Sequence, residues 1–181
     1  MQAPAELVSL VFRNPAAIHR FSMSDWDKVV RQARQAGLLA RLHGLLQQEG
    51  LDASIPAVAR WHFEVATVLV DRQQSAIRRE LRQLLELLAH LAFPLVLLKG
   101  AAYLAADLPA ARARAIDAID LLVPRECVDK IEATLKLADW HAADLPDYDL
   151  RYYRRWRHEA PLLQHLRCTT VVNVHHAILP D

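Results

Sequence analysis

The chain has 181 residues, of which 53% are apolar and 24% are charged. This balance supplies enough apolar surface for a packed core and argues against a chain that is disordered throughout. The formal net charge is only +1. Overall charge therefore gives no reason to expect a nucleic acid or a membrane as partner, and any such partner must be recognised by a local patch.

Targeting and redox features predict a cytoplasmic protein with no membrane partner. The N-terminus lacks the basic segment and apolar run of a secretory signal. The most apolar stretch, residues 84–98, is interrupted by charged residues and a proline and is too short to cross a bilayer. The two cysteines, Cys127 and Cys168, lie far apart without CxxC spacing, which favours reduced thiols over a disulfide or a zinc site.

The first predicted helix begins at Ser24, which precedes Asp25 and Asp27. A serine cap and an acidic first turn satisfy the unpaired amides and the dipole of a helix N-terminus. Apolar residues at steps of three and four continue the pattern to about Gln48, and we expect the helix to stop near Gly50.

A second helical region starts at Pro56 and runs to about Leu91 without an internal glycine or proline. It is either one long helix or two helices that meet near Asp71. Its leucine stripe is expected to pack on the core, with the charged residues on the solvated face. We take residues 1–92 as an N-terminal helical region.

The pattern of apolar residues changes at Pro94, where short apolar runs bounded by turn residues replace the helical pattern. The predicted strands cover residues 95–98, 119–123, 140–143 and 169–177, and the predicted helices among them cover 101–106 and 125–137. This order predicts an α+β fold, in which residues 93–181 form a small mixed β-sheet core with helices on one side. The chain stops directly after a strand, which suits a fragment of something longer.

Three segments carry residues suited to nucleotide chemistry. They are Leu97-Leu98-Lys99-Gly100-Ala101-Ala102, the run Arg112 to Pro124, which contains Asp117-Ala118-Ile119-Asp120, and Val171-Val172-Asn173-Val174-His175-His176. Their order and spacing resemble the uncharacterised bacterial nucleotidyltransferase family, which is related to the minimal polymerase-beta-like nucleotidyltransferases. The resemblance covers most of the chain, and the segment from Tyr152 to Pro161 also looks like a family feature.

The resemblance implies a nucleoside triphosphate and Mg²⁺ as ligands, and transfer of a nucleotidyl group to a hydroxyl of an unknown acceptor. Two carboxylates at positions i and i+2 of a strand share one face, and a third on a neighbouring strand completes the oxygen cage for the metal. Aligned on the family pattern, Asp120 is the second acid and the surviving metal ligand, while Ala118 and Asn173 replace the first and third. The amide oxygen of Asn173 can still ligate magnesium, but without the negative charge. Asp117 substitutes for the first acid only if a bulge re-aims it. Metal-dependent transfer should therefore be severely impaired.

Nucleotide-binding roles follow from the same resemblance. Gly100 and Ala101 match the family's glycine turn, at which backbone amides approach phosphates. Lys99 and Arg114 match positions that contact phosphate. From the residues alone, Lys99 is equally well a solvent-facing strand end, and Arg114 is equally well the partner of a carboxylate.

Two further features have a structural explanation that we favour. Strand alternation puts His175 on the face of Asn173 and His176 on the other face, and a satisfied structural histidine is favoured over a phosphate or base contact. The basic and aromatic segment 151–157 can hold triphosphate or single-stranded nucleic acid, but a surface element whose aromatic residues pack on the core is favoured.

Other site classes lack their motifs, because the sequence contains no GxGxxG, GxxxxGK[ST], GxSxG or HExxH pattern. Two alternatives to a transferase remain. One is a non-catalytic module on the same fold that binds a nucleotide, RNA or a protein, and the other is an oligomerisation or partner surface formed by the N-terminal helices.

Overall fold

The computed structural model describes residues 6–142, 163–165 and 170–178. Residues of the basic segment 151–157, the Tyr152 to Pro161 stretch and Cys168 lie outside the described residues. The chain forms two compact units, one of Met1–Gln73 with Arg112–Ala115 and one of Gln74–Ala111 with Ile116–Asp181. The predicted boundary at residue 92 stays a prediction.

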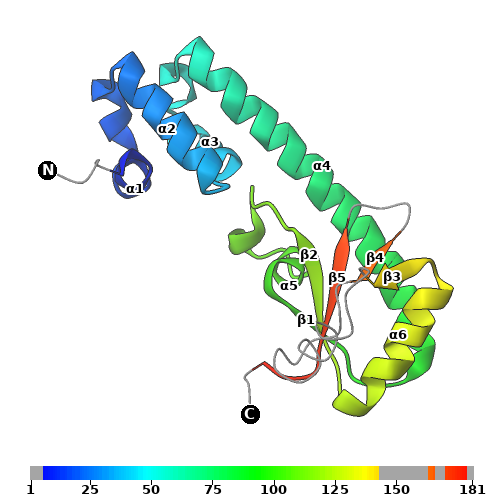
Figure 1. Ribbon diagram of the computed structural model, residues 1–181. Coiled ribbons are helices and arrows are strands. Elements are labelled where there is room, and N and C mark those ends of the chain that lie inside the picture. The colour runs from blue at the N-terminus through cyan, green and yellow to red at the C-terminus, as the bar shows by residue number, and fades with distance from the viewer. Residues whose placement is uncertain (1–5, 143–162, 166–169, 179–181) are drawn as a thin grey trace, which may run out of the picture. The chain divides into compact units, whose positions relative to one another are not determined.

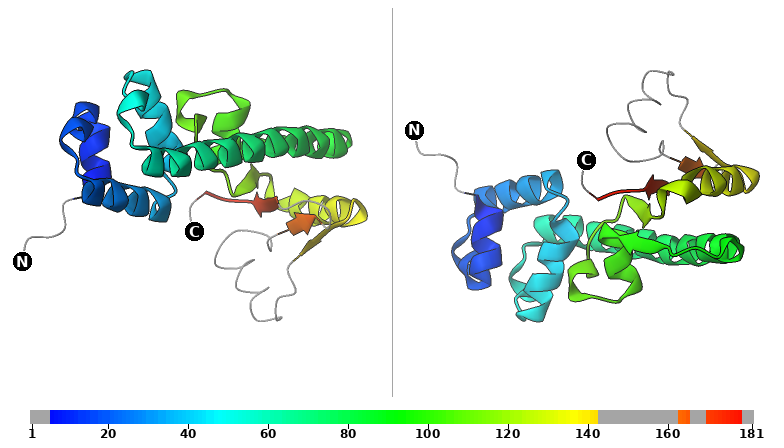
Figure 2. Two further views of the ribbon diagram at one scale, coloured as in Figure 1. Left: turned by 90° about the horizontal axis from the view of Figure 1, so that it is seen from above. Right: turned by 90° about the horizontal axis from the view of Figure 1, so that it is seen from below.

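The first unit is helical. It holds α1 (Leu7–Arg13), α2 (Met23–Gln35), α3 (Leu39–Gln48) and the first part of α4 (Ala57–Leu88), with short 3₁₀ helices at Pro15–Arg20 and Asp52–Ser54. Figure 1 and Figure 2 show α2 beside α3. Apolar residues of all four helices form one hydrophobic cluster, which includes Val11, Val29, Leu42 and Phe63. The periodic apolar pattern of the sequence is thus the buried face of these helices.

Helix α2 begins two residues earlier than predicted, because the N-cap is Ser22 and not Ser24. The Ser22 hydroxyl accepts a hydrogen bond from the backbone N–H of Asp25 at 3.2 Å, and the Asp25 carboxylate accepts one from the backbone N–H of Ser22 at 3.0 Å. This capping box satisfies two otherwise unpaired amides. The prediction placed the N-cap two residues too late.

The prediction of one helix from Ser24 to Gln48 was wrong. The chain turns at Gly37, whose φ is +67°, and Leu38 donates to the carbonyl of Ala33 at 2.7 Å. The left-handed glycine and this hydrogen bond end α2 in a way that is common at helix C-termini. The predicted stop at Gly50 is confirmed, because α3 ends at Gln48 and Gly50 also has a left-handed φ of +69°.

Helix α4 is a single helix from Ala57 to Leu88, so the first of the two alternatives for this region is the one observed. Pro56 directly precedes it, where its missing N–H leaves no helical hydrogen bond unmade. A 3₁₀ turn, Ala89–Leu91, follows and ends at Ala92, whose φ is +51°.

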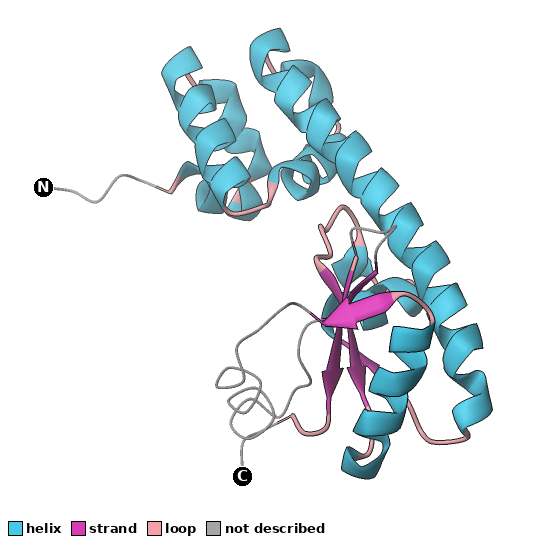
Figure 3. Cartoon of the chain, turned by 45° about the vertical axis from the view of Figure 1, so that its right-hand side comes forward, coloured by secondary structure: helices cyan, strands magenta, loops and turns pink. Residues whose placement is uncertain are grey.

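The second unit contains a five-stranded mixed sheet (Figure 3). Its strands are β1 (Val96–Leu98), β2 (Ala118–Leu122), β3 (Trp140–Ala142), β4 (Leu163–His165) and β5 (Val171–His175), in the spatial order β1-β2-β5-β4-β3. β2 and β5 are parallel, and the other neighbours are antiparallel. The helices are α5 (Lys99–Ala105) and α6 (Val128–Leu137), with 3₁₀ helices at Pro109–Ala111 and Arg125–Cys127.

The two faces of the sheet differ in polarity. Ile119 and Leu121 of β2 and Val172 and Val174 of β5 point to one face and are fully buried. They form one core cluster with residues of α4, α5 and α6. The opposite face carries Asp120 and the polar residues beside it. The predicted α+β fold, with a mixed sheet covered by helices on one side, is confirmed.

Most predicted elements of the second unit match the structure within about three residues. The strand β4 was not predicted, and neither was α1 in the first unit. Cys127 has a free thiol. Within the described ranges, no helix combines the length and the apolar character that a bilayer crossing requires.

Candidate functional site

Asp120 occupies the middle of β2 and is the centre of the candidate site. It lies opposite Leu98 of β1 and opposite Asn173 of β5. Since directly paired residues share a face of a sheet, Asp120 and Asn173 lie side by side on the face away from the apolar core. Asp120 is only 5% exposed. A buried carboxylate requires compensating partners.

One oxygen of Asp120, Oδ1, has three nitrogen partners. They are Nζ of Lys99 at 2.7 Å, Nε2 of His175 at 2.9 Å and Nδ2 of Asn173 at 3.1 Å. We call these four residues the Asp120 cluster. The alternation of β5 brings His175 and Asn173 to the same face, and Lys99 follows directly after β1. Three segments far apart in the sequence therefore converge on one carboxylate oxygen.

These partners decide the charge state of Asp120. Burial alone raises the pKa of its carboxyl, because desolvation disfavours the charged form. Hydrogen bonds from His175, Lys99 and Asn173, together with the positive charge of Lys99, outweigh burial and lower the pKa from 3.8 to about 2. The carboxylate is thus ionised at neutral pH and only accepts hydrogen bonds, so Nε2 of His175 carries a proton.

At the turn from β1 to α5, the residue with the unusual backbone conformation is Lys99 and not Gly100, where the family resemblance led us to expect it. The left-handed conformation belongs to Lys99, whose φ is +52°. Gly100 is buried, and a Cβ on it would lie 3.1 Å from Cγ2 of Ile116. A side chain at this position would therefore press on Ile116, which would have to shift by a few tenths of an ångström. Ala101 is fully buried in the core, whereas the Lys99 side chain is 58% exposed.

The remaining predicted residues are placed as follows. Ala118 pairs with Val171 and, two residues from Asp120, shares its face without offering a ligand atom. β2 pairs with β5 residue by residue from Ala118 to Leu122, without a bulge, and Asp117 precedes the strand and is exposed. The bulge that would re-aim Asp117 is not found. Arg114 belongs to the other unit, and its phosphate-binding role stays a prediction.

His175 is the site residue that the sequence prediction left out. It was interpreted as a satisfied structural histidine, and it is buried and hydrogen-bonded as that interpretation requires. Its partner, however, is the site carboxylate. The available signal was the two-residue spacing from Asn173, which puts both side chains on one face.

The Asp120 cluster does not fit a magnesium ion as it stands. Magnesium prefers several oxygen ligands, usually with one or two carboxylates. Here one carboxylate is present, and its Oδ1 is occupied by three N–H donors. Within residues 6–142, 163–165 and 170–178, no group of three or more His, Cys, Asp or Glu residues is arranged to hold a metal. Oδ1 of Asn173 is a buried acceptor without a hydrogen bond to the described residues, but it is a single neutral oxygen.

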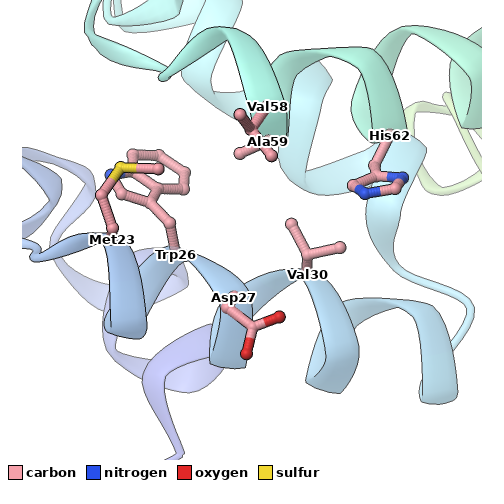
Figure 4. A pocket seen from close by; sticks show the side chains of 7 residues that line it. All are labelled: Met23, Trp26, Asp27, Val30, Val58, Ala59 and His62. Carbon is pink, nitrogen blue, oxygen red and sulfur yellow. The ribbon is translucent and has the colours of Figure 1, made fainter.

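A pocket lies in the first unit, lined by residues of α2 and α4. Its volume is about 150 Å³, and Figure 4 shows α2 on one side of it and the start of α4 on the other. The lining residues are Met23, Trp26, Asp27, Val30, Val58, Ala59 and His62. Apart from Asp27 and His62 the lining is apolar, and none of the lining residues belongs to the Asp120 cluster.

The fold and the site define an α+β protein whose mixed sheet is covered by helices on one face and carries a polar, carboxylate-centred site on the other. The sequence model of an uncharacterised nucleotidyltransferase family matches residues 22–181, and the chain belongs to this family. The match includes α2, α3 and α4 as well as the sheet, so the family assignment made from the motifs is confirmed. No curated protein matches the chain.

Proposed function

We propose that this protein binds a nucleoside triphosphate at the face of the sheet that carries Asp120 and that its transfer of a nucleotidyl group to a hydroxyl acceptor is weak or lost. Family membership supports the triphosphate as ligand. The composition of the Asp120 cluster supports the loss of transfer.

The observation that carries the proposal is the pairing of β2 with β5. It places positions 118, 120 and 173 on one face of two adjacent strands, which is where three carboxylates would act together on a metal. Only position 120 is a carboxylate. Without the carboxylates that hold the metal, the metal's stabilisation of the charge on the reacting phosphate is lost, which costs on the order of several kcal/mol.

Restoring the acids tests this proposal. The double variant Ala118→Asp/Asn173→Asp should transfer label from α-labelled ATP to an acceptor at least about tenfold faster than the unchanged protein, in the presence of Mg²⁺. The matched control is Ala118→Asn, which adds a side chain of the same shape without the charge and should give no gain. Absence of any gain on all acceptors tested, with circular dichroism unchanged, would contradict the proposed activity.

The second candidate is a non-catalytic module on the same fold that binds RNA or a protein. The three N–H donors on Oδ1 of Asp120 favour it, because this oxygen is already engaged within the protein. A labelled single-stranded RNA discriminates the two. Binding that excess ATP does not displace supports the module, and displacement by ATP supports a nucleotide site.

A further inference from the structure

We infer that the Lys99 ammonium takes the place of a divalent cation in this site, so that the protein binds a nucleoside triphosphate without metal. The inference rests on the proposed function and specifies how the same site is neutralised. It follows from the mismatch between the Asp120 cluster and a magnesium site.

Access to Asp120 is the first argument. The carboxylate side chain is 6% exposed and the Lys99 side chain is 58% exposed, with Nζ 2.7 Å from Oδ1. A divalent cation bound to Oδ1 would lie close to this ammonium, and the two positive charges would repel each other strongly. The divalent cation must therefore displace the ammonium in order to bind. The lysine thus supplies the positive charge next to the carboxylate and opposes a metal at the same oxygen.

The other two hydrogen-bond partners of Oδ1, Asn173 and His175, also oppose the binding of a metal. Nδ2 of Asn173 and Nε2 of His175 present hydrogens to Oδ1, and a metal needs lone pairs instead. In the alternative orientation of the Asn173 amide, its oxygen would face the carboxylate oxygen, which is unfavourable. The whole donor set is therefore arranged for an anion, the carboxylate, and would have to reorganise for a cation.

The backbone holds Lys99 in this place. Lys99 follows Leu98, which pairs with Asp120, and its φ of +52° is rare for a residue other than glycine. Such a conformation persists only where the surrounding structure enforces it. An ammonium has three N–H groups. One engages Asp120, and the exposed side chain can direct another to a phosphate oxygen.

Metal binding gives the first test. Titration with Mn²⁺ alone, followed by electron paramagnetic resonance and by the thermal unfolding midpoint, should show no site-specific binding to the unchanged protein. Lys99→Met/Asn173→Asp, which removes the ammonium and replaces one of the two other N–H donors by a carboxylate, should gain Mn²⁺ binding, and Asn173→Asp alone, with the ammonium in place, should gain less. The matched control Lys130→Met removes an exposed lysine of α6 and should gain none. Lys99→Arg keeps the cation and should also exclude Mn²⁺.

Nucleotide binding gives the second test, and it separates the two proposals. For the unchanged protein, calorimetry should give the same affinity for ATP in the presence of EDTA as in the presence of Mg²⁺. In EDTA, the affinity of Lys99→Met for ATP should be at least about tenfold lower than that of the unchanged protein. Mn²⁺ binding by the unchanged protein, or ATP binding that requires Mg²⁺, overturns the inference and leaves the proposed function intact. Failure of ATP to bind under either condition overturns both.

Discussion

At the scale of single residues, the Asp120 cluster shows how one carboxylate organises a site. Its Oδ1 accepts from a lysine, an amide and a histidine that lie 21, 53 and 55 residues away in the sequence. A buried charge is tolerated only when it is paired and hydrogen-bonded. The partners of Asp120 meet this condition and leave a site in which a metal has no evident place.

The lowered pKa of Asp120 predicts a pH-dependent stability. Because the folded pKa of about 2 lies below the ordinary value of 3.8, the ionised carboxylate stabilises the fold fully above the ordinary value. This contribution is lost as pH falls through the folded pKa. Asp120→Asn should therefore reduce the free energy of unfolding by on the order of 2 kcal/mol at neutral pH and by little in strong acid.

Urea unfolding of both proteins across this acid range measures the effect. The control is Asp117→Asn, which removes an exposed carboxylate three residues away and should leave the difference from the unchanged protein small at every pH. A loss of stability in Asp120→Asn that does not depend on pH would show that the ionisation of Asp120 contributes nothing.

The left-handed conformation of Lys99 gives a second prediction at this scale. Lys99→Gly and Lys99→Ala both remove the ammonium, but only glycine adopts a φ of +52° without strain. Lys99→Gly should therefore be more stable than Lys99→Ala by about 1 kcal/mol. Chemical denaturation of the two variants measures the difference. Equal stability would mean that residue 99 is not held in the left-handed region.

At the scale of elements, the helical region is divided by the glycines that end α2 and α3. Both Gly37 and Gly50 have left-handed φ values, and a Cβ at either position would meet no atom within 4 Å. The cost of a side chain there is consequently conformational and not steric. The two helix ends depend on glycine for their backbone geometry alone.

Gly37→Ala should accordingly reduce the free energy of unfolding by about 1 kcal/mol. Gly44→Ala is the matched control. Gly44 lies inside α3, and its added Cβ would be 3.9 Å from Cβ of Ala113, an ordinary contact. This variant should be neutral or stabilising by up to about 1 kcal/mol, because alanine favours the helix. If both variants behave alike in thermal unfolding, α2 and α3 are not separated by a left-handed glycine.

At the scale of the whole molecule, the described core residues form two distinct hydrophobic clusters. One includes Phe63 and Leu42 of the helical unit, and the other includes Leu121 and Ile131 of the sheet unit. Each unit therefore has an apolar core of its own, which is the property expected of an independently packed domain.

Core substitutions should act mainly within their own unit. Phe63→Ala and Leu121→Ala each empty a fully buried position and should cost about 2–5 kcal/mol. Hydrogen exchange should rise in α2 and α3 for the first variant, and in β2 and β5 for the second. Faster exchange of both units in both variants would indicate a single cooperative core.

The sequence by itself determined the class of fold and the family. Apolar periodicity is a local property, and it located α4, α5, α6 and four of the five strands because each buries its own face. The same alternation placed Ala118 and Asp120 on one face. The motifs around Gly100, Asp120 and Asn173 identified the family and led to the prediction that Ala118 and Asn173 replace two of its acids.

The tertiary structure alone decided what holds Asp120. The contacts of Lys99 and His175 with this carboxylate depend on the register of β1, β2 and β5, which long-range packing sets and local pattern does not encode. The strand β4 was missed because Leu163, Gln164 and His165 form no apolar run, and only the pairing with β3 and β5 identifies these residues as a strand. The split at Gly37 was missed because the apolar pattern continues across it, and only the backbone conformation shows that one helix ends there.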